Sequence, residues 1–289
     1  MGAKVNKIKR PRSFWYILIL TILSAGLIFT NAILGMVIPF HVSILIGFIL
    51  LLLVFVFWDA YQRYGLRTTL LMLGGTYLAA FTAEMLGVNF GLIFGEYYYT
   101  ERLGIQILGV PLLAGTAWGP ITYAAYHLSC RLWPFPDMSK KPFSTRLFVH
   151  IFPSFMAALA ATAWDLVIDP IAVADGWWIW VGGGQYLPSI KGGIPNSNFI
   201  GWIALSFLIQ MVFRMVLLPH EDHSKIIDGP VILYLSLYLT SIGVALTVTR
   251  EGVVAVIGAF CMGIFIFPIL TNKEFLSSIG GSHKIRKNK

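Results

Sequence analysis

The sequence predicts an all-α membrane protein, a bundle of about eight transmembrane helices in one integral membrane domain over residues 1–289, with both termini cytoplasmic. Hydrophobic residues make up 57% of the chain and charged residues only 12%, whereas soluble domains average about a quarter charged residues. The apolar residues form runs long enough to cross a bilayer, which takes about 20 residues of helix. The basic residues gather at the chain ends and in short loops between these runs.

The first apolar run holds two helices, because it is too long for a single span. Asn31, Gly35 and Pro39 interrupt it, which places the helices over about 14–30 and 40–58. Basic residues before an apolar run are typical of a secretory signal, but no small-residue cleavage site stands out here. We therefore expect the segment to be retained.

Charged residues end the second helix, and a third is predicted over about 68–88. This helix carries Glu84 near its far end. A loop rich in glycine and tyrosine follows over 89–104. The fourth helix is expected over about 110–131, starting beside Pro111.

A basic loop separates the fourth helix from a fifth over about 147–168. A long loop rich in tryptophan and glycine then covers 169–197. Three apolar runs predict the last helices, over about 199–218, 230–248 and 252–270.

The distribution of basic residues orients this bundle. Lysine and arginine favour cytoplasmic loops, and with eight spans the basic loops near 63–67 and 140–141 and both chain ends fall on one side. The net charge of +8 therefore reflects topology rather than nucleic-acid binding. We expect a multi-pass protein of the cell membrane.

Two acids lie at the same predicted depth in the membrane. Glu84 and Asp165 each lie about one turn from the outer end of a helix that runs outward. Carboxyl groups at bilayer depth are costly and usually mark function. Asp169 follows Asp165 by four residues and shares its helix face if the helix continues, until Pro170 disturbs it. The loops rich in tyrosine and tryptophan emerge on the same side, so acids and aromatic rings converge there.

This combination of groups suits the protonation of an isolated carbon–carbon double bond. A carboxyl surrounded by apolar groups keeps its proton and can act as a general acid. A second, ionised carboxylate acts as a base, and tryptophan faces attract positive charge. Protonation of a trisubstituted alkene gives a tertiary carbocation, and water then gives a tertiary alcohol.

Structural alternatives remain for each group. Glu84 and Asp165 also suit hydrogen bonds between helices, and Asp169 with Pro170 suits a helix end or turn. The aromatic residues of the two loops also suit an interfacial belt. Asn198 also suits the capping of the helix that follows it.

Metal and cofactor motifs are absent from the sequence. The six histidines are scattered without metal-ligand spacing, and the two cysteines indicate neither a disulfide framework nor a metal site. His220-Glu-Asp-His223 comes nearest to a metal cluster, but a charged turn explains it better. No nucleotide-binding or serine-hydrolase motif occurs. We expect neither a cofactor nor a metal.

An ordered set of motifs resembles the membrane carotenoid biosynthesis proteins of the bisanhydrobacterioruberin hydratase type. The resemblance covers about residues 81–202, which we treat as the family-like core, and it also includes Trp118. The motifs are Glu84-x-x-Gly87, Gly91-x-x-Phe94-Gly95-x-Tyr97-x-Tyr99-Thr100, Leu103-Gly104, Gly109-Val110-Pro111-Leu112, Trp164-Asp165-Leu166-x-Ile168-Asp169-Pro170, Gly176-Trp177-x-x-Trp180 and Pro195-x-x-Asn198-Phe199-x-Gly201-Trp202.

The resemblance implies a cofactor-free hydratase, a hydro-lyase of the carotenoid 1,2-hydratase kind. Such an enzyme adds water across the terminal 1,2 double bond of an acyclic carotenoid end, as in bacterioruberin synthesis or on the acyclic end of gamma-carotene. Its expected partners are the acyclic carotenoid, water and the lipid bilayer, together with other enzymes of the carotenoid pathway, and not nucleic acid.

Membrane depth and motif position predict the site residues. Glu84 or Asp165 is the expected proton donor, with the other, or Asp169, orienting water. The expected aromatic walls facing the cation are Trp164, Trp177 and Trp180, and the further substrate-binding residues are Tyr97, Tyr99, Trp118 and Asn198.

Two other functions stay open at this point. Prenyl transfer would need an Asp-x-x-x-Asp magnesium motif, and Asp165 and Asp169 have that spacing; isomerisation and cyclisation are related possibilities on the same scaffold. A lipid or isoprenoid transporter is the alternative from another class, although the paired inverted halves common in transporters are not visible. The segment 181–195 is longer than the compact connection that the resemblance implies, and it is a candidate cap for the site.

Overall fold

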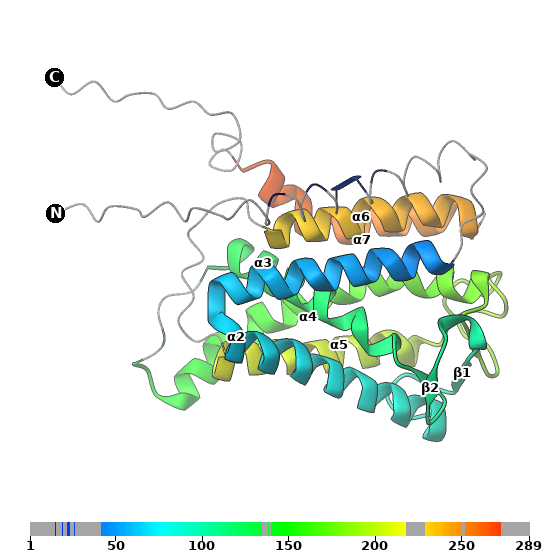
Figure 1. Cartoon of the computed structure of the whole chain (residues 1–289), viewed down its shortest axis with the longest axis horizontal. Coiled ribbons are helices and arrows are strands. Elements are labelled where there is room, and N and C mark those ends of the chain that lie inside the picture. Colours follow the sequence, from blue (N-terminus) through cyan, green and yellow to red (C-terminus); the bar gives the residue numbers. More distant parts are fainter. Residues whose placement is uncertain are drawn as a thin grey trace.

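The described part of the chain is mostly helical, with two short two-stranded sheets (Figure 1). This computed structural model describes residues 42–134, 138, 140–217, 229–249 and 252–272, and isolated positions among the first 26 residues. The predicted helix over 14–30, apart from those positions, lies outside the described residues. The two chain ends and the turn from His220 to His223 also lie outside them.

Helix α2, Val42–Phe90, contains both predicted helices over 40–58 and 68–88. Gly65 divides it with φ 76° and ψ 169°, a backbone conformation that glycine adopts readily because it has no Cβ. The two arms run in opposite directions and diverge from the turn toward their far ends (Figure 1). The turn therefore comes at Gly65, and Asp59 and Arg63 belong to the first arm.

The predicted helix over 110–131 begins late, because α3 spans only Trp118–Leu132. Val110–Pro111 forms strand β3, which pairs with β2, Gln106–Ile107, and Ala114–Thr116 forms the 3₁₀ helix η2. The hairpin satisfies its backbone groups without a helix, for example through the bond from Leu112 N to Ile105 O at 2.9 Å. The prediction of helix over 110–117 was wrong for this reason.

Helix α4, Phe143–Asp175, is longer than the predicted 147–168 and passes through Pro170. Proline has no N–H for the carbonyl four residues earlier, which is that of Leu166. The Tyr186 hydroxyl donates to this carbonyl at 2.8 Å in its place. Asp169 therefore lies within a helix rather than at its end, and Asp165 lies about three turns from the end, not one.

Helix α4 is the centre of the bundle and packs against α3, α5, α6 and α7. These partners span Asn196–Val212 for α5, continued by the π-helical turn η3 at Phe213–Leu217, Gly229–Val248 for α6 and Gly252–Leu270 for α7. The middle of α4 is rich in buried alanine. Small side chains let membrane helices approach closely, so this segment suits a central position.

Five helices among the described residues are long and apolar enough to cross a membrane. They are Gly47–Phe90, Phe143–Asp175, Asn196–Val216, Gly229–Leu246 and Gly252–Leu270. This finding supports a membrane protein. The total of eight spans and the cytoplasmic termini remain predictions from the sequence.

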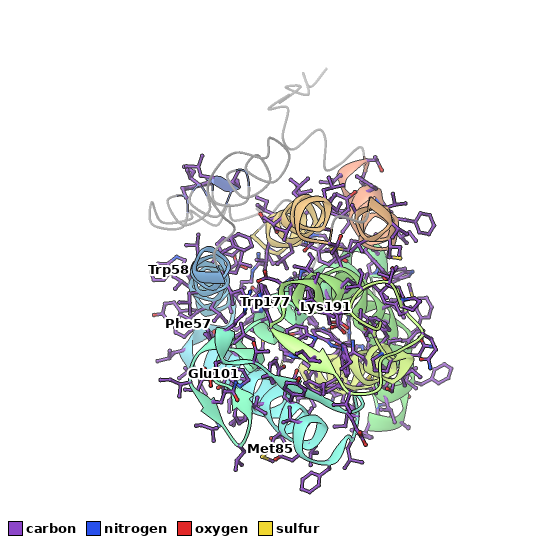
Figure 2. The ribbon with its side chains drawn as sticks, turned by 90° about the vertical axis from the view of Figure 1, so that its right-hand side faces the viewer. Phe57, Trp58, Met85, Glu101, Trp177 and Lys191 are labelled. Carbon is purple, nitrogen blue, oxygen red and sulfur yellow. The ribbon has the colours of Figure 1, made fainter. Side chains whose placement is uncertain are left out.

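A two-stranded ribbon closes one end of the bundle (Figure 1). Strand β1, Tyr97–Tyr99, pairs antiparallel with β4, Trp178–Trp180. The 3₁₀ helix η1, Glu101–Leu103, follows β1. Figure 2 views the molecule from this end and shows Trp177, the residue before β4, over the middle of the bundle.

Candidate active site

A cavity lies beneath the ribbon, between the ribbon and helices α2 to α6. It contains about 1210 Å³ of space not filled by atoms, a figure that includes open solvent at its mouth. All ten predicted site residues line it: Glu84, Tyr97, Tyr99, Trp118, Trp164, Asp165, Asp169, Trp177, Trp180 and Asn198. The structure thus brings together residues that are up to 114 positions apart in the chain.

Glu84 forms the first acidic centre of the cavity. It projects from the second arm of α2 and is 7% exposed. Its Oε2 accepts hydrogen bonds from the hydroxyls of Tyr97 and Tyr99, the latter at 2.9 Å. Trp118 lines the same cavity as Glu84. Gly87, one turn after Glu84, makes room for Tyr97, since a Cβ there would lie 2.8 Å from the Tyr97 ring.

The two tyrosines act as constant donors to Glu84. Burial raises the pKa of Tyr97 and the pKa of Tyr99 well above the ordinary value, and the neighbouring Glu84 charge adds to both shifts. Both hydroxyls therefore stay protonated at neutral and mildly alkaline pH.

Asp165 and Asp169 form the second acidic centre, on one face of α4. Both are almost fully buried, and one residue of α5 bridges them. The Asn198 side-chain nitrogen donates to Asp165 Oδ2 at 2.8 Å and to Asp169 Oδ2 at 2.6 Å. A side-chain amide has two N–H bonds, so each acid receives one.

Asp169 receives two further hydrogen bonds, both from strand β4. The indole N–H of Trp178 donates to Asp169 Oδ1 at 2.6 Å, and that of Trp180 donates to the same oxygen at 3.3 Å. Among the residues that the structure describes, Asp169 thus has three donors, whereas Asp165 has the one from Asn198. Donors stabilise the charged form of a carboxyl group, so this arrangement favours Asp169 as the charged member of the pair.

The β1–β4 ribbon holds both acidic centres at once. Alternate residues of a strand point to the same face, and here Tyr97 and Tyr99 on one strand bond to Glu84 while Trp178 and Trp180 on the other bond to Asp169. Direct pairing places Tyr99 opposite Trp178 and Tyr97 opposite Trp180.

A second aromatic wall comes from α3, α4 and α5. The rings of Trp118 and Trp202 stack with centroids 3.8 Å apart and an interplanar angle of 12°. Trp164 meets Trp202 edge to face at 6.0 Å. Aromatic faces on this wall and on the ribbon therefore surround the acids, and the cavity is otherwise largely apolar.

Sequence reasoning missed two residues of this site. Trp178 donates the shorter of the two hydrogen bonds from the ribbon to Asp169, and the Trp202 ring packs between those of Trp118 and Trp164. The alternation in Trp178-Ile-Trp180 was a signal for Trp178, since it places both indoles on one strand face. Trp202 already belonged to one of the motifs that carry the resemblance.

The structure decides several of the alternatives. Trp177 and Trp180 are only 3% and 6% exposed. The residues of an interfacial belt face the membrane surface, so that interpretation is wrong for these two tryptophans. Asn198 does not cap α5, whose N-cap is Pro195 without a side-chain cap bond. None of the residues 181–195, all of them described, lines the cavity, so the long segment is not its wall.

Within the described residues, no group of three or more His, Cys, Asp or Glu side chains has an arrangement suited to a metal ion.

Comparisons with known proteins identify a family and one relative of this chain. The profile of the family described as carotenoid biosynthesis protein matches residues 40–266. Bisanhydrobacterioruberin hydratase from Haloarcula japonica is 29% identical over 137 residues, which are 47% of this chain and 41% of that protein. The matched part therefore spans about two fifths of the relative. No solved structure matches this chain.

Proposed function

This chain belongs to the carotenoid biosynthesis protein family, and we propose that it is a hydratase, a lyase that adds water to the terminal 1,2 double bond of an acyclic carotenoid end. The single observation that carries the proposal is the apolar, aromatic cavity in which Glu84, Asp165 and Asp169 meet. Such a cavity offers a proton and a held water molecule to a substrate without polar groups of its own.

Asp165 is the proton donor in this proposal. It shares the Asn198 amide with Asp169, and two carboxylates so close together in an apolar cavity do not both ionise readily. Asp169 accepts three hydrogen bonds, which stabilise its ionised form, so it is the charged member of the pair. The proton therefore belongs to Asp165, which also lines the cavity.

Glu84 orients the water molecule in this proposal. A carboxylate offers about four acceptor positions, and the hydroxyls of Tyr97 and Tyr99 both donate to Oε2 of Glu84. Acceptor positions on Glu84 therefore remain for a water molecule. Asp169, with three donors, is the nearby alternative.

The proposed reaction proceeds in two steps through a tertiary cation. Asp165 transfers its proton to C2 of the substrate, and the electron pair of the double bond forms the new C–H bond, which leaves the cation at C1. The water oxygen then adds to C1 and releases one proton to Glu84. Glu84 then releases this proton and Asp165 takes one up, which restores both groups, so the net change is the addition of one water molecule.

The aromatic walls suit the cation intermediate. An aromatic face contributes about 0.5–2 kcal/mol to a nearby positive charge, most strongly for tryptophan. Trp164, Trp177 and Trp180 line the same cavity as the acids. The apolar remainder, from the first arm of α2 and from α6, suits the hydrocarbon chain of a carotenoid.

The decisive experiment compares the pigments of cells that make an acyclic carotenoid with and without this protein. Chromatography and mass spectrometry should show a gain of one or two water molecules with the wild type. Glu84→Gln and Asp165→Asn should lose it. Asp59→Asn is a matched control, because Asp59 is also a buried acid but does not line the cavity, and product per folded protein should then resemble the wild type.

Other products would replace the proposal. A gain of an isoprene unit would indicate prenyl transfer, and a rearranged pigment of unchanged mass would indicate isomerisation or cyclisation. A pigment that is unchanged but redistributed between membrane fractions would indicate transport.

A further inference from the structure

The indole of Trp178 makes a short, direct hydrogen bond to the carboxyl group of Asp169. Trp178 Nε1 lies 2.6 Å from Asp169 Oδ1, whereas Trp180 Nε1 lies 3.3 Å from the same oxygen. The Trp178 ring also meets the Tyr99 ring edge to face at 5.7 Å. Trp178 is therefore held on both sides, by a carboxylate and by a tyrosine that bonds to Glu84.

We propose that Trp178 is a positioning residue for the hydration reaction, whose N–H fixes Asp169 as the charged carboxylate and so leaves the proton on Asp165. The inference rests on the proposed function, and it adds a residue that acts through Asp169. A charged donor–acceptor bond of this kind is short and strong. It also fixes the orientation of the acid, whose other oxygen receives the Asn198 bond.

Asp169 is surrounded by both titratable groups and hydrogen-bond donors. The titratable groups that face Asp169 are Asp165 on its own helix, Glu84 from α2, Tyr99 from β1 and Tyr186 from the segment after β4. Two of these are acids, which oppose a second negative charge. The donors from Trp178, Trp180 and Asn198 therefore offset that repulsion.

The ribbon explains how a loop residue can hold this position. Backbone bonds extend the pairing on both sides, from Thr100 N to Trp177 O at 2.9 Å and from Val181 N to Glu96 O at 2.9 Å. The Thr100 hydroxyl adds a bond to Gly176 O at 2.8 Å. Trp178 is thus part of a paired strand, whose backbone bonds fix the direction of its side chain.

The test uses the full-length protein in detergent or nanodiscs with an acyclic carotenoid. Trp178→Phe removes the N–H and keeps an aromatic ring, so kcat should fall about 10- to 100-fold, the range expected for a hydrogen bond to a charged group, with a much smaller change in KM. Trp178→His restores a ring N–H and should recover part of the loss. Tyr98→Phe and Ile179→Val change the outward face of the same ribbon and should retain wild-type turnover.

Two readouts separate positioning from packing. The acid limb of the activity–pH profile should move to higher pH in Trp178→Phe, because Asp169 then needs a lower proton concentration to stay charged. Combined with Asp169→Asn, Trp178→Phe should change turnover by less than about 2-fold, since coupled residues are not additive. Additive losses, together with an unshifted profile, would overturn the proposal.

An infrared titration tests the same role without turnover. The carboxylate band assigned to Asp169, by its loss in Asp169→Asn, should convert to the protonated form at a higher pH in Trp178→Phe than in the wild type. If the wild type hydrates no carotenoid but this shift occurs, the proposed function fails while Trp178 still controls Asp169. An identical titration in both proteins would reject the role of Trp178 whatever the reaction is.

Discussion

Tyr97 and Trp180 lie opposite each other in the β1–β4 ribbon with ring centroids 4.8 Å apart, and each bonds to an acid from a different helix. The Tyr97 hydroxyl donates to Glu84 of α2, and the Trp180 indole donates to Asp169 of α4. A displacement of either strand would therefore disturb both acidic centres. The ribbon makes the two centres one unit, although they project from separate helices.

Asn198→Ala should greatly reduce hydration, because it removes the donor that Asp165 and Asp169 share. A hydrogen bond to a charged group is worth about 1.5–3 kcal/mol, which corresponds to about a 10- to 100-fold loss of turnover. Product formation per folded protein measures the effect. Asn196→Ala is the matched control on the same turn of α5, because Asn196 is exposed. Equal activity of the two variants would show that the acids do not need the bridge.

Gly87→Ala should lower both stability and hydration. The added Cβ would lie 2.8 Å from Cε1 of Tyr97, and overpacking of this kind typically costs about 1–3 kcal/mol. Tyr97 must then move away from Glu84. Gly75→Ala is the control in the same helix, since a Cβ there meets nothing within 4 Å. Thermal unfolding in detergent and turnover should separate the two variants, and a fully active Gly87→Ala protein would contradict the role of Tyr97.

The buried tyrosines predict a loss of stability at alkaline pH. Burial raises the pKa of Tyr97 and of Tyr99 in the folded protein, whereas in the unfolded chain both ionise near the ordinary value of about 10. Their contribution to the free energy of unfolding is therefore complete below about pH 10 and declines as the pH rises further. Thermal unfolding on both sides of this pH should show a smaller decline in the Tyr97→Phe/Tyr99→Phe double variant. Equal declines would mean that the two hydroxyls are not buried.

The coarse arrangement of this protein could be predicted from hydropathy. Apolar runs and breaks predicted the positions of most described helices. The prediction that Asp165 lies one turn from its helix end was wrong, because α4 continues to Asp175, but Asp165 and Glu84 do line one cavity. This part succeeds because the length of a membrane helix is set by the bilayer and is visible locally in the sequence.

The contacts between distant segments could not be predicted in the same way. Strands β1 and β4 are short and about 80 residues apart in sequence, and their side chains bond to acids from two different helices. β-strand propensity depends strongly on such surroundings. The hairpin at 106–111 satisfies its own backbone bonds, so the apolar character of this segment indicated a helix wrongly. Pro170 looked like a helix end because the compensating donor, Tyr186, lies in another segment.

This compensation gives the last prediction, which concerns Tyr186 and Pro170. Tyr186→Phe removes the hydroxyl that donates to Leu166 O and keeps the ring that packs edge to face on Phe199 at 4.9 Å. Leaving a buried acceptor without its donor costs about 1–3 kcal/mol. In a Pro170→Ala background the same change should cost less, because residue 170 then has an N–H for Leu166 O.

A double-mutant cycle of thermal unfolding measures this coupling. Contacting residues typically show coupling of about 0.5–3 kcal/mol, and the sign here should be that Pro170→Ala protects against Tyr186→Phe. Additive costs would show that Tyr186 stabilises α4 by another route. Because Asp169 directly precedes Pro170, the coupled variants should also differ in hydration, and this would connect the backbone of α4 to the position of its acid.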